Sequence, residues 1–209
     1  MKTQMKEQID MLQFEKEFAS QGKTLIAGID EAGRGPLAGP VVVASVIMPL
    51  DNIIDGINDS KKLSEKKRNE LFEKIKQTAI SYHIEVIDEK IIDDINILNA
   101  TKLGMKNCID KLDKTPDVVL IDAVKIDSDV QTVSIIKGDA KSYSIAAASI
   151  LAKVYRDNLM LQYDKEYPVY NFAKHKGYGT KMHIDAIKQY GICPIHRRTF
   201  VKNFYEQKG

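Results

Sequence analysis

The stretch TLIAGIDEAGRGPLAGPVVVASVI, residues 24–47, decides the fold. Its first part, residues 24–30, is a short apolar run that ends in Asp30, and its last part, residues 41–47, is a continuous run of β-branched and small residues. Continuous apolar runs of this kind are typical of strands that are buried on both faces of a sheet. The glycines and prolines between the two runs disfavour a helix and favour a shaped loop.

The remaining sequence alternates helical segments with apolar runs. Strands that come first along the chain and then alternate with helices indicate an α/β fold with a mixed β-sheet flanked by helices. Ser64 precedes one helical segment and predicts its N-cap. We predict further strands at residues 82–87, 117–122 and 132–139, helices at 64–79, 97–112, 142–163 and 180–189, a loop at 170–179 and a basic tail from residue 194.

Residues 1–22 predict a short amphipathic helix that Gly22 closes. We interpret this segment as an N-terminal helical extension that packs on the rest of the chain. Residues 23–209 are expected to form one domain that includes a helical C-terminal part. A length of 209 residues agrees with this division, since a domain holds roughly 150 residues.

Composition places the chain among ordered globular proteins, with 44% hydrophobic and 29% charged residues. No run approaches the ~18 apolar residues of a membrane-spanning helix, so we expect no membrane association. The charged N-terminus does not resemble a secretory signal. The two cysteines, Cys108 and Cys193, lie far apart and outside any zinc motif, which indicates a reduced, cytoplasmic protein.

The net charge of +2 hides an uneven distribution of charge along the chain. Residues 1–136 carry 18 basic and 23 acidic side chains, whereas residues 137–209 carry 13 basic and 6 acidic ones and eight of the nine tyrosines. Basic residues interleaved with aromatic ones are one signature of a nucleic-acid-binding surface. A solvated, lysine-rich surface remains the alternative interpretation.

Three of the predicted strands end in carboxylates. Asp30, which Glu31 follows directly, ends the first strand, and Asp122 and Asp139 end two others. The carboxyl ends of strands in an open α/β sheet form its ligand-binding edge. Like charges gathered there need a counter-charge, and oxygen ligands favour Mg²⁺ or Mn²⁺ over zinc. Alternatively, each aspartate opens a turn or caps a helix.

The glycine-rich loop, Gly33 to Gly39, does not fit a nucleotide-binding motif. It has one residue too many before its last glycine for a dinucleotide loop, and Pro36 removes a backbone donor. The chain also lacks a Walker motif and a GxSxG serine-hydrolase motif. The alternative is a loop whose missing side chains let a nucleic-acid backbone approach the metals, with Arg34 contacting phosphate.

Taken together, the motifs of this sequence resemble those of the ribonuclease HII family. The resemblance runs in order through about residues 23–205. Ribonuclease HIII resembles the chain less, because that family typically has threonine where Arg34 stands. The matching segments are Ile26–Pro40, Asp59–Ser64, Leu120–Ala123, Lys137–Asp139, Ser144–Lys153, Arg156–Asp157, His175–Thr180 and His196–Phe200.

This resemblance implies an RNase H-like fold and a metal-dependent endonuclease. Its substrates would be RNA–DNA hybrids and DNA duplexes that contain single ribonucleotides, cut 5′ of the ribonucleotide to leave a 3′-hydroxyl and a 5′-phosphate. We expect a monomer. The competing hypotheses are a catalytically silent nucleic-acid-binding module of the same fold and another two-metal nuclease, which would lack the glycine loop and Tyr178.

The resemblance also implies roles for individual residues. Four carboxylates match the catalytic metal ligands for Mn²⁺ or Mg²⁺: Asp30, Glu31, Asp122 and Asp139. The backbone of Gly33, Arg34 and Gly35 matches the loop that senses the ribose 2′-hydroxyl. Tyr178 matches the residue that packs on the RNA–DNA junction.

Several basic residues are further candidates for contacts with phosphate, although each fits a solvated surface equally well. Lys61 and Lys62 follow the matched Asp59-Ser60 pair. His175 and His196 fit either proton transfer or a structural role, and Cys108 is predicted to be a small core residue. The other basic candidates are Lys153, Lys174, Lys176, Arg197 and Arg198.

Overall fold

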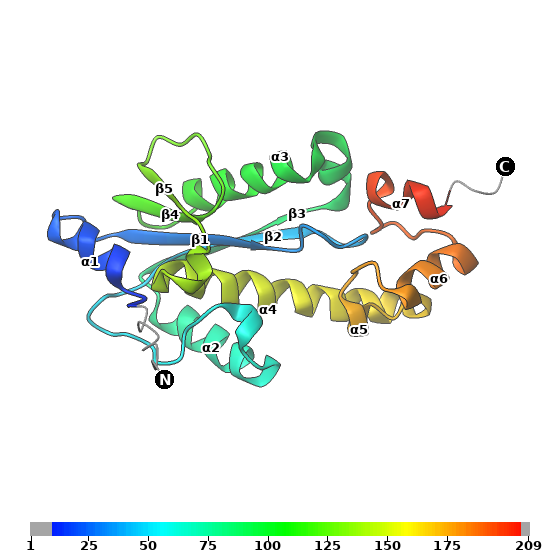
Figure 1. The fold of residues 1–209 in the computed structure, drawn as a ribbon, viewed down its shortest axis with the longest axis horizontal. Helices are drawn as coiled ribbons and strands as arrows, with labels where there is room; N and C mark the ends of the chain where they lie inside the picture. Colours follow the sequence, from blue (N-terminus) through cyan, green and yellow to red (C-terminus); the bar gives the residue numbers. More distant parts are fainter. Residues whose placement is uncertain (1–9, 206–209) are drawn as a thin grey trace, which may run out of the picture.

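Five strands form one mixed sheet in the order β3-β2-β1-β4-β5 (Figure 1). The computed structural model describes residues 10–205. β1 and β2 run antiparallel, as do β2 and β3, whereas β4 runs parallel to both β1 and β5. The strands are β1 (Ile26–Ala32), β2 (Val41–Ile47), β3 (Ser81–Ile87), β4 (Val118–Asp122) and β5 (Thr132–Ile135).

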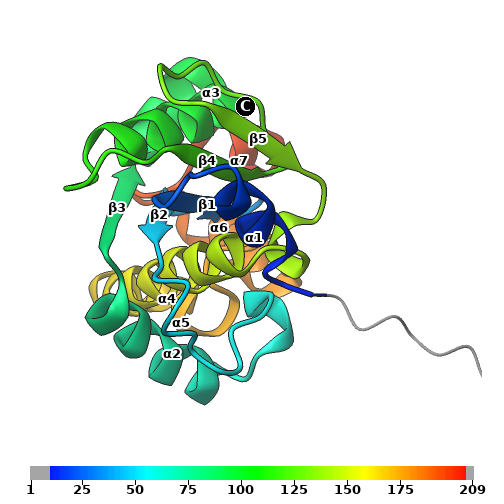
Figure 2. The ribbon, with the colours of Figure 1, turned by 90° about the vertical axis from the view of Figure 1, so that its left-hand side faces the viewer.

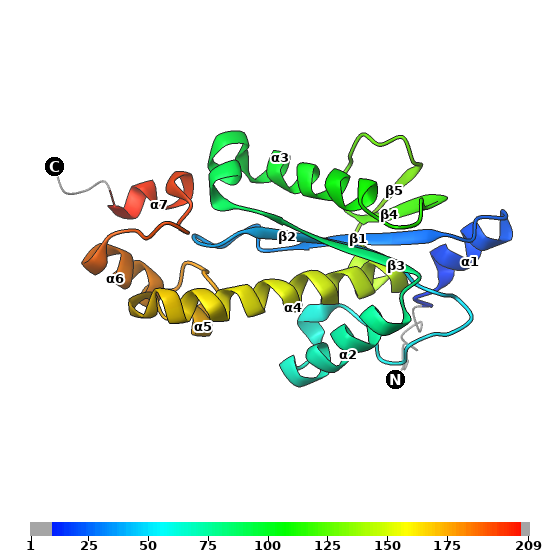
Figure 3. The ribbon, with the colours of Figure 1, turned by 180° about the vertical axis from the view of Figure 1, so that it is seen from behind.

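Helices cover both faces of this sheet. α3 lies on one face, and α2 and α4 lie on the other, which is clearest where the sheet is viewed from its end (Figure 2). α1 lies at one end of the sheet and α5, α6 and α7 lie at the opposite end (Figure 3). The helices are α1 (Gln13–Ser20), α2 (Glu65–Thr78), α3 (Glu89–Asp110), α4 (Tyr143–Glu166), α5 (Phe172–His175), α6 (Lys181–Tyr190) and α7 (Arg198–Tyr205), with short 3₁₀ turns η1 (Ser60–Lys62), η2 (Gly138–Ala140) and η3 (Pro168–Tyr170).

The central strands are buried on both faces, as their continuous apolar sequence predicts. Successive side chains of a strand point to opposite faces: Val42 packs into the core cluster that contains α4, and Val43 packs into the cluster that contains α3. Cys108 of α3 is fully buried, which confirms its predicted core position. Gly28 lets β1 approach α4 closely, because a Cβ atom there would lie 2.0 Å from the carbonyl carbon of Ser144.

The predicted strand at 132–139 is wrong in its second half. β5 ends at Ile135, and Asp139 lies in the 3₁₀ turn η2 rather than at the end of a strand. Lys137 has a left-handed backbone (φ 58°), which cannot continue an extended strand. The amide of Gly138 then donates a hydrogen bond to Asp122 Oδ1 (2.7 Å), so the chain turns back over the end of β4.

Two helical boundaries also differ from the prediction. α3 begins at Glu89, capped by Asp88, and not at residue 97. Asn96 breaks it with a non-helical backbone (φ 65°), and its side chain accepts hydrogen bonds from the next turn, so the segment after Asn96 starts where the sequence predicts. The basic tail from residue 194 contains α7.

α1 covers only part of the helix predicted for residues 1–22, of which residues 1–9 lie outside the described residues. Its Phe18 packs into a core cluster with β1 and β4. The buried carboxylate of Glu15 accepts hydrogen bonds from Ser142 Oγ (2.6 Å) and from the amide of Ser144 (2.9 Å). α1 is therefore tied to the first turn of α4.

Among the helices that the structure describes, none has the length and apolar character to cross a membrane.

Candidate functional site

The sheet brings two of the predicted carboxylates together. β1 and β4 are parallel neighbours, with Ile29 opposite Ile121, so the next residues, Asp30 and Asp122, lie side by side at the carboxyl ends of the strands. η2 brings Asp139 to the same edge, because the residue before it is bonded to Asp122. The structure therefore gathers these carboxylates at one edge of the sheet, as the sequence predicts.

These carboxylates carry more negative charge than their surroundings neutralise. Burial, and then the charge of Glu31, hold the pKa of Asp30 well above its ordinary value, although Asp30 Oδ1 accepts a hydrogen bond from the amide of Glu31 (2.8 Å). Burial also raises the pKa of Glu31 against the effect of Arg34, whose Nη1 lies 3.3 Å from Glu31 Oε1. Burial likewise raises the pKa of Asp122.

A cavity of about 310 Å³ opens beside Asp30 and Glu31. Asp122 and Asp139 are not among the residues that line it. The lining residues come from β1, the glycine loop, η1, α4 and the segment before α6: Asp30, Glu31, Ala32, Gly33, Arg34, Gly35, Ser60, Lys61, Ser149, Lys153, Arg156 and Tyr178.

The four carboxylates are neighbours, but they do not surround one point. Within residues 10–205, no group of three or more acidic, histidine or cysteine side chains is arranged to hold a metal ion. Asp122 Oδ1 accepts its hydrogen bond from the amide of Gly138, and Asp139 Oδ2 pairs with Lys61 Nζ at 3.3 Å. All four carboxylates thus have at least one partner within the chain.

The chemistry of the site nevertheless fits a divalent cation. Glu31 Oε2 is buried without a hydrogen-bond partner among the described residues, and an acceptor of this kind costs about 1–3 kcal/mol. The candidate donors are all carboxylate oxygens, which Mg²⁺ and Mn²⁺ prefer. Burial is the main cause of the raised pKa values of Asp30 and Glu31, and a cation would relieve the repulsion from neighbouring carboxylates that adds to it.

The glycine loop requires glycine at Gly33. Its backbone is left-handed (φ 98°), and a Cβ atom there would lie 2.0 Å from Arg156 Nε. Tyr178, which is 46% exposed, also lines the cavity. A Cβ atom on Gly35 would lie 3.7 Å from its ring. The loop and Tyr178 therefore form adjoining parts of the cavity wall.

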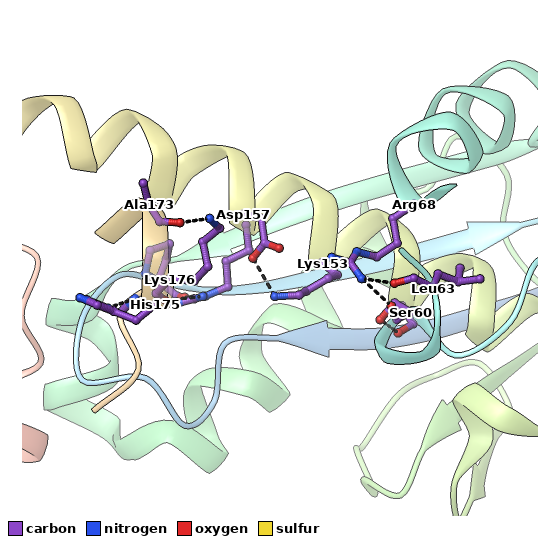
Figure 4. A network of polar contacts seen from close by, with 12 residues as sticks. Ser60, Leu63, Arg68, Lys153, Asp157, Ala173, His175 and Lys176 are labelled. Atoms are coloured by element: carbon purple, nitrogen blue, oxygen red, sulfur yellow. Dashed lines mark hydrogen bonds and ion pairs between the residues drawn. The ribbon is translucent and has the colours of Figure 1, made fainter. Parts of the chain in front are cut away.

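Lys61 is held beside the carboxylates by the turn that contains it. Arg68 donates hydrogen bonds to the carbonyls of Ser60 (3.0 Å) and Leu63 (2.6 Å), which fixes η1 against α2 (Figure 4). Partial burial acts to lower the pKa of Lys61, but the charge of Asp139 and other carboxylates outweighs it and raises that pKa. Lys62 is exposed and does not line the cavity.

The other basic candidates differ in their surroundings. Lys153 pairs with Asp157 at 2.8 Å and lines the cavity, and Lys176 Nζ donates to the carbonyl of Ala173 (Figure 4). The interpretation of Arg197 as a surface contact to phosphate is wrong, because Arg197 is fully buried and hydrogen-bonded to backbone. Lys174 and Arg198 are exposed.

The histidines that the sequence offered as candidates are buried away from the cavity. His183 Nε2 lies 3.0 Å from His196 Nε2, and the ring of His175 stacks on that of His183 with centroids 4.5 Å apart. Burial lowers the pKa of His183 and of His196 to about 4. The carbonyl of Tyr178 accepts a hydrogen bond from His183 Nδ1 (2.9 Å). The cluster fits the structural interpretation, and it supports the backbone at Tyr178.

Two serines belong to the site that the sequence analysis did not single out. Ser149 of α4 lies near the carboxyl of Asp30, and its Oγ forms a hydrogen bond with Ser60 Oγ (2.8 Å). Both hydroxyls line the cavity. The available signal was a polar residue within a run of alanines, because Ser149 follows Ala146, Ala147 and Ala148.

Comparisons with known proteins place the chain beside one family. The family model of ribonuclease HII matches residues 27–207. A ribonuclease HII of Ruminiclostridium cellulolyticum is 60% identical over 197 residues, which cover 94% of this chain and 77% of that protein. A ribonuclease HII of Clostridioides difficile is 58% identical over 191 residues, covering 91% and 75% of the two chains.

Solved structures give the same result at lower sequence identity. The ribonuclease H2 of Pyrococcus horikoshii aligns with a TM-score of 0.75 at 27% identity, over 87% of this chain and 97% of that one. The ribonuclease HII of Archaeoglobus fulgidus, solved in complex with PCNA, aligns with a TM-score of 0.72 at 27% identity, over 88% and 98%. A ribonuclease HIII in complex with Mn²⁺ shares the fold at 20% identity, with a TM-score of 0.66 over 83% and 65%.

Proposed function

Because the chain belongs to the ribonuclease HII family of metal-dependent endoribonucleases, we propose that the cavity beside Asp30 is its catalytic centre. Ribonuclease HII cleaves the RNA of RNA–DNA hybrids and cuts at ribonucleotides embedded in duplex DNA, and this chain has that function. The observation that carries the assignment to this cavity is the group of buried, incompletely neutralised carboxylates at the carboxyl ends of β1 and β4.

In this proposal Asp30, Glu31, Asp122 and Asp139 are the metal ligands and the catalytic carboxylates. Their position at one sheet edge and the raised pKa values of the first three support the assignment. Bound Mn²⁺ or Mg²⁺ would supply activation of the attacking water and stabilisation of the leaving oxygen at the scissile phosphate.

The chain's own side chains orient this centre. Ser149 lies near the carboxyl of Asp30, and Arg34 holds Glu31 Oε1. Lys61 lies beside Asp139, where its ammonium can turn to a phosphate as the substrate approaches, because the Lys61 side chain is 76% exposed. Gathering these groups before the substrate arrives reduces the reorganisation needed for reaction.

The walls of the cavity are proposed to select the substrate. The backbone of Gly33, Arg34 and Gly35 would read the ribose 2′-hydroxyl, which distinguishes RNA from DNA. The exposed ring of Tyr178 would pack on the nucleotide at the RNA–DNA junction, supported by its position next to Gly35. Lys61 and the exposed Lys62 would contact backbone phosphate.

The remaining parts of the proposal concern the product and the assembly. The cut would fall 5′ of the ribonucleotide and leave a 3′-hydroxyl and a 5′-phosphate. The chain would act as a monomer. A catalytically silent binding module is the alternative. The carboxylates count against it, since binding nucleic acid alone gives no reason to bury Asp30 and Glu31 with raised pKa values.

The test uses one end-labelled DNA duplex that contains a single ribonucleotide, incubated with Mg²⁺, with Mn²⁺ or with EDTA. We expect one cut 5′ of the ribonucleotide in either metal and none in EDTA, with product ends that a ligase and a phosphatase identify. An all-DNA duplex of the same sequence is the matched control substrate and should stay intact. Binding without a cut in either metal would support the silent module instead.

A further inference from the structure

Two arginines lie buried beneath the glycine loop. Arg156 of α4 and Arg197, which directly precedes α7, are 1% and 0% exposed. Arg197 donates to the carbonyls of Gly33 (2.5 Å), Arg34 (2.9 Å) and Gly39 (2.9 Å). Arg156 donates to the carbonyls of Ala38 (3.2 Å), Pro40 (3.0 Å) and Lys176 (3.0 Å).

The hydrogen bonds of these buried charges all go to backbone carbonyls, and the guanidinium of Arg197 also lies over the ring of Phe200, 5.2 Å from its centroid. Neither guanidinium takes part in the ion pairs found among residues 10–205. Burial lowers the pKa of Arg156 to about 10 and that of Arg197 to about 9, so both remain protonated at neutral pH. A buried charge without a partner costs several kcal/mol, which six carbonyl dipoles here offset. The loop therefore rests on two positive charges.

The carbonyl contacts fix which way the loop's amides point. A peptide unit is planar and trans, so its N–H points away from its C=O. Arg197 holds the carbonyl of Gly33, which turns the amide of Arg34 in the opposite direction, and it holds the carbonyl of Arg34, which does the same for Gly35. Arg34 and Gly35 line the cavity. Among the described residues, neither amide donates to another backbone group.

We infer that Arg197 is a positioning residue that presents the amides of Arg34 and Gly35 as a pair of donors to an oxygen of the substrate's ribonucleotide strand. Arg156 supports the same loop and ties it to the segment before Tyr178 through the carbonyl of Lys176. The identity of the acceptor, an oxygen of the ribonucleotide strand, rests on the proposed function. The orientation of the amides itself follows from the hydrogen bonds of Arg197.

Arg197 is in turn fixed by its neighbours along the chain. Its amide donates to the carbonyl of Leu37 (2.9 Å), and the amide of Gly39 donates to the carbonyl of Ile195 (2.8 Å). The next residues, Arg198 and Thr199, donate backbone hydrogen bonds to Asp93 of α3 at 2.8 and 3.0 Å. Hydrogen bonds thus connect the start of α7 to both α3 and the glycine loop, which gives the C-terminal helices a role in the site.

The experiment compares the full chain with Arg197→Met, Arg197→Lys and Lys202→Met. Lys202 is an exposed cation of α7, so its substitution removes one positive charge without touching the loop. We expect Arg197→Met to lower kcat/KM on the single-ribonucleotide duplex by about 100-fold, the effect of losing aligned amide donors. Arg197→Lys should lower it roughly 10-fold, because an ammonium cannot span three carbonyls. Lys202→Met should stay within about twofold.

A merely structural role would produce a different pattern. If Arg197 acts through the loop, the loss falls on kcat, while Mn²⁺ affinity and the melting temperature of Arg197→Lys stay close to those of the unsubstituted chain. A folded Arg197→Lys with unchanged kcat/KM would overturn the inference, and so would a fall in Mn²⁺ affinity that parallels the fall in rate. If Arg197→Met does not fold, Arg197→Lys decides the question.

A second readout does not depend on activity. With ¹⁵N-labelled protein, the amide resonances of Arg34 and Gly35 should shift or broaden in Arg197→Lys and not in Lys202→Met, because the two peptide units lose their fixed orientation. Unchanged resonances would overturn the inference even in an active enzyme. If these resonances shift in Arg197→Lys but the unsubstituted chain itself cuts no ribonucleotide, the positioning role is supported and the proposed function is contradicted.

Discussion

The two sides of the cavity bury charge in opposite ways. On the β1 and β4 side, Asp30 is buried and Glu31 is partly buried, both have raised pKa values, and Glu31 Oε2 has no partner among the described residues. On the loop side, Arg156 and Arg197 are more deeply buried, yet each has three carbonyl acceptors. The acidic side is incomplete as it stands, whereas the basic side is satisfied.

This difference separates a site that waits for a ligand from a scaffold that shapes it. Buried polar groups in proteins are almost always paired, so an unpaired group indicates strain or a missing ligand. The carboxylates have the pattern expected where a cation binds. The arginines have the pattern expected of a framework, because their hydrogen-bonding capacity is already used within the chain.

The largest expected effect comes from removing a carboxylate of the incomplete side. Asp30→Asn keeps the size of the side chain and its bond from the Glu31 amide, but it removes the charge that the proposed metal needs. We expect cleavage of the single-ribonucleotide duplex to fall by about 1,000-fold or more, since metal assistance is worth several kcal/mol. The measurement is kcat with Mn²⁺ or Mg²⁺. Turnover like that of the unsubstituted chain would remove Asp30 from the metal centre.

On the loop side, the packing of the glycine loop on Arg156 is disrupted most directly by a substitution at Gly33. Gly33→Ala places a Cβ atom on Arg156 Nε in a left-handed backbone, so we expect a loss of about 3 kcal/mol in the free energy of unfolding. Gly22 offers a matched control: its φ of 83° is similar, but a Cβ atom there meets nothing within 4 Å. Gly22→Ala should cost only about 1 kcal/mol. Urea unfolding measures both, and equal losses would contradict the packing account.

A smaller effect is expected at Tyr178, which lines the cavity next to the glycine loop. Tyr178→Ala removes the exposed ring and should lower kcat/KM on the single-ribonucleotide duplex by roughly 5- to 150-fold, the range of one base–aromatic stacking contact. Tyr178→Phe keeps the ring and should stay within about threefold if packing, and not the hydroxyl, carries the recognition. Equal rates for Tyr178→Ala and the unsubstituted chain would exclude Tyr178 from substrate recognition.

The smallest effect is a pH dependence of the metal-free protein. The pKa of Asp30 is higher in the folded chain than in the unfolded one, so the folded state binds this proton more tightly. Its contribution to stability is therefore present below the ordinary pKa of about 4 and is lost as pH rises through the folded-state value. As pH rises through this range, the stability of Asp30→Asn relative to the unsubstituted chain should increase by at most about 1.4 kcal/mol per pH unit.

Urea unfolding in EDTA across this pH range measures that difference. Asp185→Asn is the control, because Asp185 is an exposed acid of α6 paired with Lys181. A stability difference between Asp30→Asn and the unsubstituted chain that does not change with pH would contradict the account of Asp30.

The sequence predicts the parts of this molecule that depend on local pattern. The alternation of apolar runs and helical segments predicts the five strands, and Ser64 predicts the cap of α2. The break in α3 at Asn96 was missed because it depends on backbone geometry that hydrophobic periodicity does not reveal. The end of β5 was misplaced because Lys137 and Gly138 turn toward Asp122, a residue distant in sequence.

The candidate site likewise combines features that the local sequence predicts with features that depend on residues distant in sequence. Strand-end carboxylates are visible in sequence because a charge after an apolar run is a local signal. The burial of Arg197 is not visible, since its acceptors, the carbonyls of Gly33, Arg34 and Gly39, carry no side-chain signal and lie far away along the chain. Charged side chains are usually exposed, so the sequence predicts a surface position for Arg197.

The contrast between the two sides of the cavity is tested most directly by Mn²⁺ binding to the metal-free protein. Free Mn²⁺ is measured by electron paramagnetic resonance while the ion is titrated into the unsubstituted chain, Asp30→Asn and the control Asp185→Asn. The account predicts saturable binding that Asp30→Asn weakens at least about 10-fold and that Asp185→Asn leaves unchanged. Saturable binding that is equal in all three proteins, or none in any of them, would contradict the assignment of the incomplete side as the metal centre.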